Sequence, residues 1–165
     1  MLLKWNLLFL CLFITAPSVT LDEFSKGKQQ QHFPKELKKK QLYLGMTLKK
    51  FEKKAPKATR LDKESEFKIE YMEAVSDSSI TSYSYLFTKN QEPLLYAITI
   101  AYKDMSTVRS LAESLMGKPN NNEEWRMEPS IIKEDFTMGA WTFGHKLVYG
   151  ATIINSEWEK GFQSN

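Results

Sequence analysis

Alternating apolar and polar positions predict β-strands through much of the chain. In residues 80–88, Tyr83, Tyr85 and Phe87 share one side, while serines point the other way. This period of two is typical of a strand with one buried face. The expected strands are residues 66–75, 80–88, 94–102, 125–127, 135–143 and 146–154.

Apolar residues at helical spacing predict two short helices. The first follows Thr47, which can cap its start, and Pro56 stops it. The second begins near Asp104 or Ser106, either of which can cap it, and ends at Gly117. The apolar faces are Leu48, Phe51 and Ala55 in the first helix, and Val108, Leu111, Ala112 and Leu115 in the second.

The order of elements predicts the α+β class, with short helices packed on one face of an antiparallel sheet. The chain runs helix, strands, helix, strands, and the helices open at Gly45 and Asp104, 59 residues apart. This order suggests a tandem duplication with repeats over residues 42–102 and 103–165. The alternative is an ordinary α+β domain with two helices on one sheet.

The N-terminus has the layout of a signal peptide. Lys4 precedes an apolar run from Leu7 to Ala16, and small or polar residues follow. This run is too short to span a membrane, which takes about 20 residues. Residues 1–20 are therefore expected to direct export to the periplasm or the medium, with cleavage near Thr20 and no integral membrane segment left. Retention of the segment as an anchor is the alternative.

Lysine and glutamine dominate the segment after the signal peptide. Residues 21–41 hold few aliphatic side chains, which predicts a flexible linker before a globular domain over residues 42–165. Residues 26–60 carry 12 basic and two acidic side chains, a net charge of +10, whereas residues 61–165 have a net charge of −6. Such a basic stretch can bind an anionic envelope surface or an acidic partner protein. The alternative is a solvated tether.

The composition excludes several kinds of chemistry. The single cysteine, Cys11, lies in the signal segment, so the exported chain is expected to hold no disulfide, zinc–thiolate site or iron–sulfur cluster. The two histidines, His32 and His145, belong to no catalytic motif. No metal, cofactor or catalytic residue is therefore predicted, and export together with a sequence pI of about 8.8 disfavours a nucleic-acid partner.

Aromatic side chains at alternating strand positions are candidates for a binding surface. Tyrosine buries a large area at a low cost in conformational entropy, so it is frequent in recognition surfaces. A row of aromatics could form a binding face on the side of the sheet away from the helices, or it could be the core beneath them. The candidate binding residues are this row and a run of lysines: Tyr83, Tyr85, Tyr96, Tyr102, Trp141, Lys38, Lys39 and Lys40.

Two short motifs add a resemblance to known proteins. Residues 44–48 (LGMTL), followed by a short helix, resemble the opening of small outer-membrane assembly proteins of the BamE/SmpA type. Residues 115–119 (LMGKP) are similar to a helix end in that superfamily, and beta-lactamase-inhibitor proteins look like tandem versions of the same unit. The resemblance implies a helix-plus-sheet fold and a binding role, without any site residue to carry over. The chain lacks the lipid-attachment cysteine of the first family and the disulfides of the second.

These features together predict an exported, non-catalytic envelope protein that binds another protein or an envelope surface. One alternative is a secreted module that inhibits an enzyme. Another is a hydrolase of envelope polymers that works with a pair of carboxylates, since glycoside hydrolysis needs no more than two acids. The oligomeric state stays open at this point.

Overall fold

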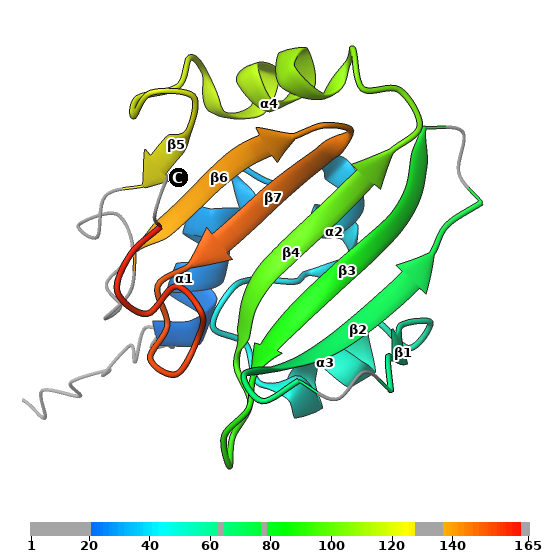
Figure 1. The fold of residues 1–165 in the computed structure, drawn as a ribbon, viewed down its shortest axis with the longest axis vertical. Coiled ribbons are helices and arrows are strands. Elements are labelled where there is room, and N and C mark those ends of the chain that lie inside the picture. The colour runs from blue at the N-terminus through cyan, green and yellow to red at the C-terminus, as the bar shows by residue number, and fades with distance from the viewer. Residues whose placement is uncertain (1–20, 63–64, 77–78, 128–136, 163–165) are drawn as a thin grey trace, which may run out of the picture.

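The computed structural model is built on one open antiparallel sheet of seven strands, with helices packed against one of its faces (Figure 1). It describes residues 21–62, 65–76, 79–127 and 137–162. The strand order is β1-β2-β3-β4-β7-β6-β5, so β4 and β7 meet in the middle while β1 and β5 form the edges. This architecture confirms the predicted α+β class.

The elements are short and follow one another closely. The helices are α1 (Leu21–Gln30), α2 (Lys35–Lys40), α3 (Leu48–Lys54) and α4 (Val108–Met116). The strands are β1 (Thr59–Arg60), β2 (Lys68–Ala74), β3 (Ile80–Thr88), β4 (Leu95–Tyr102), β5 (Trp125–Met127), β6 (Met138–Phe143) and β7 (Lys146–Ala151). Within the part of the chain described, no helix has the length and apolar character to cross a membrane. The predicted signal peptide, residues 1–20, lies outside the described residues.

Large side chains cover the face of the sheet that lies toward α1, α2 and α3. Tyr85 of β3 stands between Tyr71 of β2 and Ile98 of β4, and all three are buried. Phe51 of α3 packs edge-on against Tyr85, with 4.7 Å between ring centres. The next residue of β3 in either direction points to the opposite face, where serine, threonine and alanine predominate in β3 and β4. The alternation of aromatic and small residues along the strands therefore corresponds to side chains that face the core and the open face in turn.

The segment expected to be a flexible linker, residues 21–41, is folded. It forms α1 and α2, and Phe33 and Leu37 are fully buried against the sheet. The side chain of Gln29 donates to the carbonyl oxygen of Leu44 at 2.9 Å and accepts from the amide of Leu44 at 2.7 Å. The segment is therefore no linker, because two apolar side chains and one buried amide dock it, while Lys35, Lys38 and Lys39 stay exposed.

The two predicted helices are α3 and α4. Thr47 occupies the N-cap position of α3, although its hydroxyl makes no capping hydrogen bond. The second helix begins later than expected, at Val108, because the Asp104 carboxylate accepts from the amide and the hydroxyl of Ser106 in the preceding turn. Gly117 ends α4 with a φ of 77°, a backbone conformation that favours glycine.

The chain after β7 crosses back over the open face of the sheet. The predicted last strand, residues 146–154, ends early at Ala151. We call residues 153–162 the C-terminal strap. Its Trp158 packs edge-on against Tyr96 of β4 and Trp141 of β6, with ring centres 5.4 Å and 5.1 Å apart. The strap therefore covers one part of the open face and leaves the rest uncovered.

The strand order has the arrangement that a duplication would produce. α3 with β2, β3 and β4, and α4 with β5, β6 and β7, are each one helix followed by antiparallel strands. In both units the last strand lies innermost, and these two strands, β4 and β7, pair with each other. The topology is compatible with the proposed repeats, whose duplication stays a prediction.

Candidate functional site

Three of the predicted binding tyrosines lie in the core. Tyr83, Tyr85 and Tyr102 are 2%, 0% and 5% exposed. Tyr85 lies beneath Phe51 of α3, and burial, followed by the charge of Glu36 of α2, raises the pKa of Tyr102. The hypothesis that these three form a binding face away from the helices is therefore wrong. Burying rings removes more apolar area from water than burying serines, so the helices pack on the aromatic side.

The other two aromatic candidates lie on the open face. A register shift between β3 and β4 lets Tyr96 point there, where it is fully buried beneath Trp158 of the C-terminal strap. The hydroxyl of Tyr96 donates to the carboxylate of Glu157 at 2.8 Å. Trp141, in contrast, is only half-buried. Of the five aromatic candidates, Trp141 is the one that keeps part of its ring in solvent.

Lys40 belongs to a sheltered polar cluster. Its ammonium group forms an ion pair with Glu73 of β2, which is 7% exposed. The same group lies 3.5 Å from the Tyr85 hydroxyl and 4.5 Å from the ring centre of Tyr83. Tyr85 also donates to Glu73 at 3.2 Å. This cluster fastens α2 to the sheet, so the role of Lys40 is to hold the fold rather than to contact a partner.

Lys38 and Lys39 are exposed and belong to a larger basic surface. α2 and α3 pack on the same face of the sheet, so their solvent sides point the same way (Figure 1). The side-chain oxygen of Gln41 accepts from Lys26 at 3.3 Å and from Lys54 at 2.9 Å, which ties α1 to α3. We call the exposed lysines of this layer the basic helix face: Lys35, Lys38, Lys39, Lys49, Lys50, Lys53 and Lys57.

Few acidic groups offset the charge of the basic helix face. Glu36 and Glu52 are the acidic residues of α2 and α3. The carboxylate of Glu52 accepts from the hydroxyl of Tyr71 at 2.9 Å, and this bond together with burial raises the pKa of Tyr71. Because Leu37 and Phe51 anchor the two helices in the core, the lysines sit on a fixed layer. The layer differs in this respect from a solvated tether.

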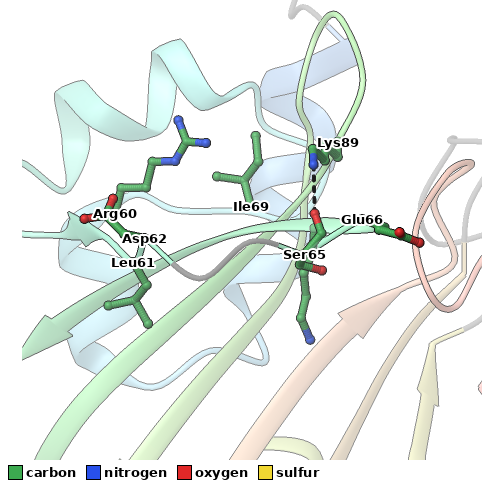
Figure 2. Close-up of a pocket in the computed structure, with 8 residues that line it drawn as sticks. Arg60, Leu61, Asp62, Ser65, Glu66, Ile69 and Lys89 are labelled. Carbon is green, nitrogen blue, oxygen red and sulfur yellow. Dashed lines mark hydrogen bonds between the residues drawn. The ribbon is translucent and has the colours of Figure 1, made fainter.

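A cavity of about 790 Å³ lies at the edge of the sheet, beside β1, the start of β2 and the β3–β4 hairpin (Figure 2). The ammonium group of Lys89 donates to the carbonyl oxygen of Ser65 at 2.9 Å across one side of it. Asp62 and Glu66 contribute two carboxylates, and both are exposed. A general acid needs a more sheltered carboxyl group, so this wall offers little for hydrolysis. The described residues that line the cavity are Arg60, Leu61, Asp62, Ser65, Glu66, Lys68, Ile69 and Lys89.

A smaller cavity lies on the open face, against the C-terminal strap. Its volume is about 120 Å³, and Glu124, Trp141, Trp158 and Phe162 line it. The strap can approach the sheet because β7 has a glycine beneath it: a Cβ at Gly150 would lie 2.7 Å from the Trp158 ring. Neither Glu124 nor Phe162 is among the predicted binding residues. The signal in the sequence was Gly150, because a glycine within a strand often marks a place where another segment packs closely on the sheet.

Comparison of the chain with protein-family models, with curated proteins and with solved structures finds no match. The resemblance to the BamE/SmpA type thus rests on the two short motifs alone. Among the residues that the structure describes, no group of three or more His, Cys, Asp or Glu side chains is arranged to hold a metal ion. The basic helix face and the cavity at the strap are the features that offer recognition chemistry.

Proposed function

We propose that the protein is an exported, non-catalytic envelope protein that binds an anionic envelope surface through its basic helix face. The observation that carries this proposal is the folded, lysine-rich layer of α2 and α3. Export is supported by the signal-peptide layout of residues 1–20. The BamE/SmpA-type motifs add an association with the envelope at the level of resemblance.

The electrostatic contribution of such a layer is substantial. Each lysine close to an anionic membrane contributes about 1 kcal/mol, and the attraction falls off over a Debye length, about 10 Å in 0.1 M salt. Lysines carried by docked helices face the surface together. A flexible tether would first lose conformational freedom, so the folded layer binds with less entropic cost.

The surroundings of the lysines favour a charged surface over an acidic protein. Stable protein interfaces are centred on buried aromatic or aliphatic anchors. Among the side chains that the structure describes in this layer, from residue 26 to the end of α3, no large apolar one is exposed. The exposed apolar side chains lie in other parts of the fold: Phe67, Met72, Met105, Phe143 and Ile154. A layer of cations without an apolar anchor suits a surface that offers many phosphate groups.

The test is binding to lipid vesicles that contain phosphatidylethanolamine and either a low or a high fraction of phosphatidylglycerol. Replacing Lys38 and Lys39 by Gln is expected to weaken binding to the high-fraction vesicles by about 2 kcal/mol, or about 30-fold. Replacing Lys103 and Lys118, exposed lysines beside α4, is the matched control. The control pair is expected to change binding by less than about threefold.

Four results would count against the proposal. Binding that does not depend on the phosphatidylglycerol fraction, or that persists at high salt, would show that the attraction is not electrostatic. An equal loss in the control pair would show that net charge matters and the basic helix face does not. Recovery of one protein by crosslinking through Lys38 and Lys39, without vesicle binding, would replace the surface with a partner protein and favour the inhibitor alternative.

A further inference from the structure

Three aromatic rings form a corner on the open face of the sheet. Trp141 and Trp158 lie 5.1 Å apart between ring centres and are inclined by 82°. Phe162 completes the corner, with its ring centre 5.5 Å from that of Trp141 and 5.8 Å from that of Trp158, inclined by 59° and 50°. A single point can therefore lie within about 6 Å of all three ring centres, the range over which an aromatic face attracts a cation.

The corner is open to solvent and rigid at its base. Trp141, Trp158, Phe162 and Glu124 are each half-buried, so the 120 Å³ cavity between them is accessible from outside. Trp141 lies on β6, within the sheet. Trp158 is held from beneath by the ring of Tyr96, at 5.4 Å between ring centres. These contacts keep the walls in place before any ligand arrives, which lowers the cost of binding.

The two fixed charges around the corner, those of Glu124 and Arg126, offset each other, so the rings supply the attraction for a cation, which is of modest affinity. Glu124 places a carboxylate in the wall of the cavity, where it also forms an ion pair with Arg126. The guanidinium of Arg126 lies 4.4 Å from the ring centre of Phe162, so this ring already attracts one cation. Trp141 and Trp158 also line the cavity, and tryptophan is the side chain whose ring attracts cations most strongly.

We propose that this corner binds a trimethylammonium head group. Rings accept hydrogen bonds poorly, so a primary ammonium would lose its bonds to water there, whereas a methylated ammonium has none to lose. The cavity has the volume of about four water molecules in the liquid, which suits a nitrogen with its methyl groups. The site is independent of the basic helix face, because it lies on the opposite side of the sheet.

The experiment is a titration of the full chain with tetramethylammonium chloride, followed by the proton resonance of the probe's own methyl groups. Ring currents are expected to shift this resonance upfield and to saturate. Sodium chloride at the same ionic strength and tert-butanol, an uncharged molecule of similar bulk, serve as controls. Neither control is expected to produce or compete with the saturable shift. Absence of a saturable shift, or equal competition by tert-butanol, would overturn the proposal.

Two variants on the same strand locate the site. Trp141→Ala is expected to weaken binding about tenfold, while Trp141→Phe retains part of it, since phenylalanine is the weaker ring for cations. Phe143 lies two residues further along β6, is 73% exposed and does not line the cavity. Phe143→Ala is therefore expected to leave binding unchanged. An equal loss in Trp141→Ala and Phe143→Ala, with both variants folded, would exclude the corner as the site.

Binding measurements with free choline and with phosphatidylcholine vesicles separate two sources of the head group. Free choline that binds while phosphatidylcholine vesicles do not would identify a small solute as the ligand. Vesicle binding that free choline displaces would identify a lipid head group. Either outcome keeps the corner as the site, and failure of both probes would overturn it. None of these results depends on binding to phosphatidylglycerol, so this proposal and the proposed function can fail separately.

Discussion

Tyrosine hydroxyls join the sheet to the layers that cover it. Tyr149 of β7 donates to the carbonyl oxygen of His32 at 2.8 Å, and Tyr71 of β2 donates to Glu52 of α3. Tyr85 of β3 donates to Glu73 of the neighbouring strand, which in turn forms an ion pair with Lys40 of α2. A phenylalanine would fill the same space without making any of these bonds. Each ring therefore contributes apolar burial and one directed contact, which explains why the core holds tyrosine at positions where phenylalanine would fill the same space.

Burial gives these phenols a common response to pH. Desolvation, followed by the charge of Glu73, raises the pKa of Tyr85, and burial likewise raises the pKa of Tyr149. A group whose pKa is higher in the folded state stabilises the fold below its unfolded pKa, about 10 for tyrosine, and loses that contribution as the pH rises further. The free energy of unfolding is expected to be level up to about pH 9 and to fall steeply above pH 10.

The change that tests this pH response is Tyr85→Phe. The variant is expected to lose about 1 kcal/mol at neutral pH, because Glu73 loses one hydrogen bond. Above pH 10 its stability should fall less steeply than that of the wild type, by about 1.4 kcal/mol per pH unit. Urea unfolding at several pH values from about pH 8 to about pH 11, a range that spans the ordinary tyrosine pKa, measures both quantities. Identical slopes in the two proteins would contradict the assignment.

At the level of single residues, alternation along a strand predicted which side chains share a face. It placed Tyr83 and Tyr85 together, and the structure confirms this. It also placed Tyr96 in one row with Tyr83 and Tyr85, which is wrong because a register shift between β3 and β4 turns Tyr96 to the open face. A β-bulge adds one residue to a strand and leaves no periodic signal in the sequence, so the error could not be detected from alternation.

At the scale of elements, the C-terminal strap depends on a glycine in the strand beneath it. A methyl group at Gly150 would lie 2.7 Å from Trp158, closer than side-chain contacts allow, and 3.0 Å from Phe162, which is a tight contact. Gly150→Ala is therefore expected to destabilise the protein by about 1–3 kcal/mol, by the ordinary cost of overpacking. Thermal unfolding measures the loss.

The matched control for that change is another glycine, Gly27 of α1. A Cβ there would meet no atom within 4 Å, and alanine favours the helix. Gly27→Ala is expected to be neutral or to stabilise the protein by about 0.5–1 kcal/mol. Gly150→Ala should also weaken tetramethylammonium binding, since it moves two walls of the aromatic corner. A fully stable Gly150→Ala protein would mean that the strap packs less closely than the structure indicates.

Elements with a strong period were predicted, and elements that depend on tertiary contacts were not. The strand over residues 80–88 and the short strand at 125–127 appear with the expected bounds. α1 and α2 were missed because their apolar residues are few and are diluted by lysine and glutamine. Their stability comes from docking Phe33 and Leu37 on a sheet formed later in the chain, and local composition carries no information on such docking.

At the scale of the whole molecule, the first segment of the described chain completes the core. Burial of Phe33 and Leu37 is worth roughly 1.5–3 kcal/mol for each side chain, a large part of the total stability of a typical domain. A chain that starts at residue 42 is therefore expected to lose cooperative unfolding and to bind a dye specific for exposed apolar surface. A chain that starts at residue 21 should unfold cooperatively. Equal thermal transitions in the two chains would restore the linker interpretation.

The contact between the start of the described chain and its last strand bears on how the protein reaches its folded state. The hydrogen bond from Tyr149 to His32 closes a loop of 117 residues, and the central pair β4–β7 also joins distant segments. Contacts so far apart in sequence form slowly, because the closure entropy must be overcome first. A chain that passes through a membrane N-terminus first therefore cannot complete this core until its last strand has emerged.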